Sequence, residues 1–193
     1  SAGTDLLLDT EWYLLKDLQL RIYFKTENKE FDSSSSGQAM KEILNGRTSR
    51  FYTRITYSLN QNLSFRFRFE LKIREEPAER PVYGILFYEE LSGRYFDNRL
   101  SFNFRYTLFD IPDWEVRIYS WEHDLLYSLS SPSYYKNGQN VFLNLRWKIK
   151  RNFSSGLKLS ATAYSSVRES GTGPDYRESL LFFDLKGQLI IKL

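Results

Sequence analysis

The sequence predicts an all-β chain folded as a transmembrane antiparallel up-and-down β-barrel of about ten to twelve strands. Three observations predict this fold: long rows of alternating apolar and polar residues, connections of two lengths, and an aromatic content of 17%. Tyr and Trp are enriched at membrane interfaces. The mean hydropathy of −0.49 does not contradict the prediction, because only every second residue of a barrel strand faces lipid.

Three segments show the alternation most clearly. Residues 63–74 place Leu63, Phe65, Phe67, Phe69, Leu71 and Ile73 on one face and polar or charged residues on the other. The same pattern recurs over residues 100–108 and 141–150. These rows are long for soluble strands, which usually run about five or six residues. They therefore favour membrane-spanning strands, and a soluble β-sandwich or lipocalin-like barrel is the alternative fold.

Weaker versions of the pattern fill the rest of the chain. Further strands are predicted at residues 18–25, 51–59, 82–95, 114–121, 125–130, 155–166 and 181–193. The barrel is assigned to residues 18–193, which gives about ten strands. Residues 1–17 form an N-terminal segment that either adds a strand or lies outside the barrel.

The predicted connections alternate between short turns and longer loops. Short turns fit at residues 16–17, 60–62, 97–98, 122–124 and 151–155, and longer loops fit at 27–46, 75–81, 131–137 and 167–175. Bacterial barrels have short periplasmic turns and longer outer loops. The alternation therefore predicts a bacterial outer-membrane location with the C-terminus on the periplasmic side. The tight link at residues 110–113 breaks the rule, and residues 38–44 could form a helical turn.

Several classes of chemistry are disfavoured by composition. The chain has no cysteine and only one histidine, which excludes a thiol nucleophile and a thiolate metal site and leaves too few ligands for a typical zinc site. The formal net charge of +3 is mild, and the glycines form no phosphate-binding loop. We expect no cofactor, no metal and no nucleic-acid partner. The expected partners are outer-membrane lipid and other envelope proteins.

A set of basic residues is predicted to face the barrel lumen. Its members are Arg66, Arg68, Arg74, Arg105, Arg117, Arg146, Lys148 and Lys150. A ring of cations lowers the barrier for anions, which would suit a narrow anion-favouring channel. Small barrels, however, are filled by side chains. We therefore expect these cations to pair with Glu70, Glu115 and other carboxylates in a packed interior.

Aromatic residues near the predicted strand ends are expected to form interface girdles. These residues are Trp12, Tyr13, Tyr95, Trp114, Trp121, Tyr134 and Tyr135. Such girdles flank the lipid-facing band of outer-membrane barrels.

His123 is the candidate base for an alternative function, an outer-membrane lipid hydrolase. It lies between Glu122 and Asp124, and Ser–His–acid hydrolases use a histidine to activate the nucleophile. No serine occurs in a nucleophile-elbow context. We therefore assign no catalytic residue and expect the chain not to be an enzyme.

The pair Glu89–Glu90 poses a problem for a lipid-facing strand. Adjacent strand residues point to opposite faces, so one of the two carboxylates should face lipid. Either that carboxylate lies near the interface or a β-bulge breaks the alternation there.

Three segments resemble a known family. They are Tyr83–Leu91, Arg105–Asp110, and Arg117–Tyr127 continuing through Pro132–Tyr135. They resemble the C-terminal region of Bacteroidota outer-membrane proteins that carry an N-terminal helix-hairpin-helix domain, over about residues 80 to 193. That domain is absent from this sequence, so its DNA binding does not carry over. The resemblance implies a Bacteroidota outer-membrane barrel, and we expect a membrane anchor or a subunit of a larger cell-envelope complex.

Overall fold

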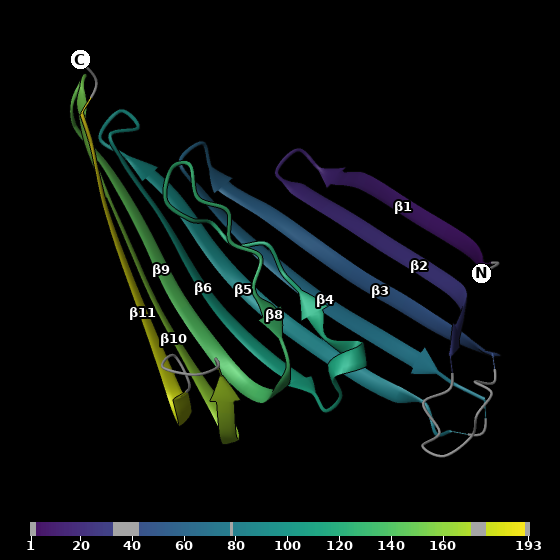
Figure 1. The fold of residues 1–193 in the computed structure, drawn as a ribbon. Helices are drawn as coiled ribbons and strands as arrows, with labels where there is room; N and C mark the ends of the chain where they lie inside the picture. Colours follow the sequence, from purple (N-terminus) through teal and green to yellow (C-terminus); the bar gives the residue numbers. More distant parts are fainter. Residues whose placement is uncertain (1–2, 33–42, 78, 171–176, 192–193) are drawn as a thin grey trace.

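The chain forms one large antiparallel sheet in a computed structural model that describes residues 3–32, 43–77, 79–170 and 177–191. Nine strands are hydrogen-bonded in the order β1-β2-β3-β4-β5-β6-β9-β10-β11 (Figure 1). Neighbours in the sheet follow one another along the chain, apart from an insertion between β6 and β9. The prediction of an all-β, antiparallel, up-and-down architecture is confirmed.

The strands of the sheet are long. They are β1 (Gly3–Leu15), β2 (Leu18–Asp32), β3 (Ile43–Asn60), β4 (Leu63–Glu75), β5 (Val82–Tyr95), β6 (Leu100–Ile111), β9 (Lys136–Lys150), β10 (Phe153–Ser170) and β11 (Arg177–Ile191). Their lengths run from 12 residues in β6 to 18 in β3 and β10. A span of about 9–11 residues is enough for a tilted transmembrane strand.

Eight of the predicted strands lie in the sheet, and the N-terminal segment supplies a ninth as β1. The strands predicted at residues 114–121 and 125–130 do not lie in the sheet: only Ile118–Tyr119 of the first is a short strand, and the second contains none. Asp113 accepts a hydrogen bond from the Glu115 backbone and begins a 3₁₀ turn, η1 (Trp114–Val116). Tyr127 has a positive φ of 63°, which breaks an extended strand. The helical turn predicted at residues 38–44 falls largely outside the described residues.

Residues 112–135 form the insertion between β6 and β9, which we call the strap. It contains η1, the short strands β7 (Ile118–Tyr119) and β8 (Ser133–Tyr134), which pair with each other, and a bridge between Glu122 and Ser130. The strap lies over one face of the sheet (Figure 1). The turn predicted at residues 122–124 is therefore part of the strap and not a link between sheet strands.

The strap also explains why the tight link predicted at residues 110–113 breaks the alternation of short turns and longer loops. Short turns join β1 to β2, β3 to β4, β5 to β6 and β9 to β10, all at one end of the sheet. The strap joins β6 to β9 at the opposite end, where the longer connections lie. Short and long connections thus alternate along the whole described sheet, and β11 runs toward the short-turn end.

The sheet has two chemically different faces. The register sets Arg54, Arg68 and Tyr88 side by side on the face that carries the strap, here called the strap face. Ile55, Phe67 and Glu89 lie side by side on the opposite face, here called the outer face. The alternation of apolar and charged residues in the sequence thus places most of the charges on the strap face, with Glu89 as an exception.

The hydrophobic core lies between the strap and the middle of the sheet. Leu86, Tyr88, Phe109 and Ile111 on β5 and β6 pack against Val116, Ile118 and Tyr134 of the strap, and all seven are buried. The apolar residues that suggested a strand at 114–121 therefore serve to dock the strap. Within the described part of the chain, no helix is long and apolar enough to cross a membrane.

Candidate functional site: a charge network beneath the strap

Polar contacts attach the strap to six strands of the sheet. The Lys72 side chain on β4 donates hydrogen bonds to the backbone oxygens of Glu115 and Arg117 at 3.0 and 3.2 Å. At the far side, Gln188 on β11 donates to the Leu126 backbone oxygen at 2.8 Å. Between these two, Asn144 on β9 donates to the Asp124 backbone oxygen at 3.1 Å, and the contacts from β5, β6 and β10 are described below. The strap is therefore held along its length across the sheet.

Two glycines allow the strap to approach the sheet closely. A Cβ atom on Gly84 of β5 would lie 2.7 Å from the backbone oxygen of Val116. A Cβ atom on Gly156 of β10 would lie 2.9 Å from the Leu125 side chain. The Val116 contact involves backbone on the strap side, so a larger residue at position 84 would have to push the strap away.

Glu90 and Arg105 form the most deeply buried ion pair of the network. Their side chains are 0% and 1% exposed, and Arg105 donates to the same carboxylate oxygen of Glu90 from Nε at 2.9 Å and Nη2 at 2.5 Å. Arg66 donates to the other oxygen at 2.7 Å. A buried carboxylate is tolerated only when it is paired and hydrogen-bonded, and Glu90 meets both conditions.

Arg105 also connects this pair to the strap. Its Nη1 atom donates to the Trp121 backbone oxygen at 2.8 Å and to the Ser120 hydroxyl at 3.3 Å. The guanidinium lies over the Tyr88 ring, 4.0 Å from the ring centroid. Arg105 therefore joins β5, β6 and the strap through a single buried charge.

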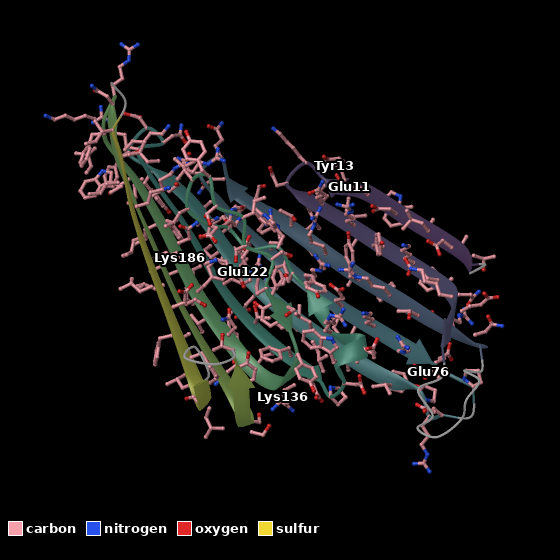
Figure 2. The ribbon with its side chains drawn as sticks, in the orientation of Figure 1. Glu11, Tyr13, Glu76, Glu122, Lys136 and Lys186 are labelled. Carbon is pink, nitrogen blue, oxygen red and sulfur yellow. The ribbon has the colours of Figure 1, made fainter. Side chains whose placement is uncertain are left out.

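A second group of charges lies toward β10 and β11. Lys158 of β10 is 3.1 Å from Glu122 and 3.6 Å from Asp124, and the Tyr134 hydroxyl donates to Glu122 at 2.6 Å. Lys186 of β11 is 3.2 Å from Asp124. Figure 2 shows Glu122 and Lys186, which come from the strap and from the C-terminal strand. The two strap carboxylates are thus neutralised by cations of the sheet.

The environment of Asp124 favours its charged form. Burial alone would raise the pKa of this carboxyl, but a hydrogen bond from the Leu125 backbone, one from Lys186, and the charges of Lys158 and Lys186 together lower its pKa below 3.8. The ionised carboxylate of Asp124 is therefore the form that holds the strap.

A third pairing lies on the strap face of β3 and β4. Glu70 is 0% exposed and accepts hydrogen bonds from Arg50 and Arg68, each at 2.5 Å. Arg68 also lies over the Tyr52 ring, 4.0 Å from its centroid. The predicted pairing of Glu70 with the basic residues is confirmed. Charge compensation therefore extends from β3 to β11.

A polar cavity of about 660 Å³ lies between the strap and the short-turn ends of the strands. Arg66, His123, Asp124, Arg146 and Lys148 are among the residues that line it. Arg146 and Lys148 form no ion pair with a described residue, so the lining carries excess positive charge. This part of the strap face fits the anion-channel alternative best.

The surroundings of His123 do not resemble a catalytic triad. Its Nε2 atom lies 3.5 Å from Glu90, and its ring packs edge-on against Trp121 at 4.5 Å between centroids. Neither partner is a serine, and the nearby Ser120 hydroxyl accepts a hydrogen bond from Arg105. No group of three potential metal ligands occurs among the described residues. The contacts of His123 are those of a side chain that packs the strap.

The structure brings most of the predicted basic residues to the strap face. Arg66, Arg68 and Arg105 lie in the network, and Arg74 contacts Glu115 of the strap at 2.8 Å. Arg146 and Lys148 lie on the strap face of β9 near the short-turn end, whereas Lys150 follows a register shift and pairs with Phe153 of the outer face. Arg117 belongs to the strap, where its guanidinium lies over Trp114. It is therefore not a residue of a barrel strand.

The predicted interface aromatics occupy different environments. Trp12, Tyr13 and Tyr95 lie near short turns and are exposed, whereas Trp114 and Trp121 are exposed residues of the strap. Tyr135 packs against Trp114. Tyr134 does not fit the prediction of an interface residue, because it is only 4% exposed and its hydroxyl binds Glu122 beneath the strap.

The sequence alone does not identify several residues of the network. Lys158 pairs with Glu122 and Asp124, which precede it in the chain by 36 and 34 positions. These contacts depend on where the strap folds back over the sheet. Glu90 has a clearer signal, because it directly opposes Arg66 and Arg105 in the strand register.

The chain was also compared with known proteins. No protein-family model matches it, and no curated protein matches it.

Proposed function

We propose that this chain is part of a non-enzymatic β-barrel of a bacterial outer membrane, which serves as a membrane anchor or as a subunit of a larger envelope complex. The observation that carries the proposal is the distribution of side chains in the sheet. Charged residues are buried on the strap face, and large apolar residues are exposed on the outer face. This distribution suits a sheet whose outer face contacts lipid.

The exposed apolar residues of the outer face extend across the sheet. They include Ile55, Phe67, Phe69, Ile85, Phe104, Leu108, Trp147, Leu159, Phe183 and Leu185. Soluble proteins rarely expose continuous apolar patches of more than a few hundred Å². In a soluble sandwich, a second layer would cover the apolar face. Here the strap covers the charged face, which argues against the soluble alternative.

An anchoring or structural role fits the strap face better than an open channel does. The strap lies across this face, and Glu70, Glu90, Glu122 and Asp124 compensate its most buried cations. A narrow anion-favouring channel is the second candidate, and the cavity beside Arg146 and Lys148 favours it. Single-channel recordings distinguish the two, since discrete conductance steps support the channel and a silent bilayer supports the anchor.

Single-tryptophan variants test the contact with lipid. Trp147 lies on the outer face and is 55% exposed, whereas Trp121 lies in the strap and is 51% exposed. In vesicles of brominated lipid, fluorescence from a variant that keeps only Trp147 should be strongly quenched. A variant that keeps only Trp121 should be quenched much less and should respond to aqueous iodide. Equal quenching of both by iodide would contradict the proposal.

The subunit role has a separate test. Gentle detergent extraction from the native membrane should recover the protein with stable envelope partners. A monomer that remains alone under these conditions would favour the simple anchor over the subunit.

A further inference from the structure

The two outermost strands of the sheet each have one edge that is not hydrogen-bonded to another strand. Among the described residues, β1 pairs only with β2 and β11 pairs only with β10. All but one of the residues of β1 are exposed, including Leu6, Leu7 and Leu8. Soluble proteins protect such edges with charges, proline or a covering segment. A lipid environment is stricter still, because it leaves no water to bind free backbone groups.

The directions of these two strands restrict how the edges can be closed. Each strand is antiparallel to its neighbour, so direction reverses at every step across the nine strands. The first and ninth strands, β1 and β11, therefore run the same way. Direct closure of β1 on β11 would give a parallel ladder, whereas bacterial single-chain barrels have an even number of antiparallel strands.

A second copy of the chain does not remove this restriction. Two copies inserted in the same orientation would place β1 of one copy beside β11 of the other. Both seams would again be parallel, and parallel pairing is slightly less stable per residue than antiparallel pairing. Only an odd number of added strands can be antiparallel to both edges.

We propose that an odd number of further strands from the same polypeptide, outside these 193 residues, closes the sheet into a barrel with an even number of strands. The proposal rests on the membrane location proposed above. The connectivity supports a source in the same polypeptide, because every ladder of the sheet joins strands that follow one another along the chain, with only the strap between β6 and β9.

The side chains of β1 indicate what its missing neighbour should look like. Leu6, Leu8 and Trp12 lie on the outer face and require an apolar neighbour there. Asp5, Asp9 and Glu11 lie on the strap face, where each contacts a cation of β2 or β3 and keeps 32–50% of its side chain exposed. Directly opposed charges of opposite sign stabilise a ladder. We therefore expect Lys or Arg on the strap face of the added strand.

Photocrosslinking in the full-length protein in its native membrane tests this proposal. A photoreactive residue replaces Thr4 or Trp12, which lie at two heights along β1. Both should crosslink to one segment outside residues 1–193, identified by mass spectrometry. The order should be reversed, so that Thr4 reaches a later residue of that segment than Trp12 does. The equivalent probes on β11, at Phe183 and Leu185, should behave in the same way.

Two controls make every outcome informative. A probe at Ile55 should crosslink to β4 near Phe67, its partner in the register, which establishes the efficiency of the reaction. With that control working, any of four results overturns the proposal: crosslinks between β1 and β11, crosslinks in parallel order, crosslinks to a different polypeptide, or none from β1. A probe at Phe67 tests the proposed function separately, because it should label lipid whether or not the edges are closed in this way.

Discussion

Arg105 is the residue on which the attachment of the strap depends most. It is 1% exposed, it pairs with Glu90, and it donates to the strap backbone. Replacing Arg105 with Met leaves the Glu90 carboxylate buried with weaker compensation. Removal of one partner of a buried ion pair costs about 3–5 kcal/mol. We expect R105M to lower the free energy of unfolding by about 3 kcal/mol in urea titrations of the protein in detergent or lipid.

Two further variants serve as comparisons for R105M. Arg94 lies on the strap face of β5, but it is exposed and forms no ion pair with a described residue. The effect of Arg94→Met on the free energy of unfolding should therefore stay within about 0.5 kcal/mol. The double variant E90L/R105M should be less destabilised than R105M, because no buried charge is left unpaired. Equal loss in the Arg94 and Arg105 variants would refute the role given to this pair.

Asp124 gives the attachment of the strap a defined pH dependence. Its pKa is lowered in the folded protein, so its stabilising effect is complete well above 3.8 and is lost as the pH falls through the folded value. The difference in unfolding free energy between the protein and D124N should therefore be largest near neutral pH and shrink below pH 3.8. Asp110→Asn, an exposed position at the end of β6, should show a much smaller difference at neutral pH.

Glu89 answers the question raised by the Glu89–Glu90 pair. The register is uninterrupted through both residues, so no bulge occurs, Glu90 faces the strap and Glu89 lies on the outer face between Phe67 and Tyr106. A carboxylate at this position is unfavourable in lipid, by less than the 2–4 kcal/mol of Arg or Lys at the midplane. We expect E89L to raise stability in vesicles by about 1–2 kcal/mol.

The matched control for E89L is Glu79→Leu, which changes an exposed carboxylate between β4 and β5 and should have little effect. A loss of stability in E89L would instead indicate that Glu89 makes a specific contact on the outer face.

The strap is the element whose position the sequence predicts least well. Its apolar residues Val116 and Ile118 alternate as in a strand, but they are buried against β5 and β6 because the 3₁₀ turn after Asp113 redirects the chain. Alternation identifies which residues seek an apolar environment, and it does not tell whether that environment is lipid or a core. The sheet strands were predictable because their pattern extends over many more residues.

Gly84 provides a test of the strap as an element. We expect Gly84→Val to displace the strap, because a Cβ atom there would lie 2.7 Å from the Val116 backbone oxygen. Limited proteolysis should then cleave residues 112–135 faster than in the unmodified protein. Gly187→Val on β11 is the matched control, since nothing lies within 4 Å of the corresponding Cβ position. Equal cleavage of the two variants would exclude a close approach of strap and sheet at Gly84.

For the sheet as a unit, the sequence predicts strand order, register faces and the alternation of connections, and it predicts a closed barrel of about ten to twelve strands. The nine described strands form a sheet with two edges. Alternation within a strand does not determine whether the sheet closes, because closure depends on pairing between the first and last strands. The basic strap face and its partner Glu115 were predictable from the pattern of charges, whereas the pairing of Glu122 and Asp124 with Lys158 was not.

The strap also has a mechanical consequence. Its contacts with Lys72 on β4 and Gln188 on β11 fix two strands that are separated in the sheet by β5, β6, β9 and β10. It therefore links the two sides of this part of the sheet, and any movement of β4 away from β11 must stretch or break the contacts at its ends. In the membrane location proposed above, lateral pressure would then be resisted by the side-chain contacts of the strap as well as by backbone ladders.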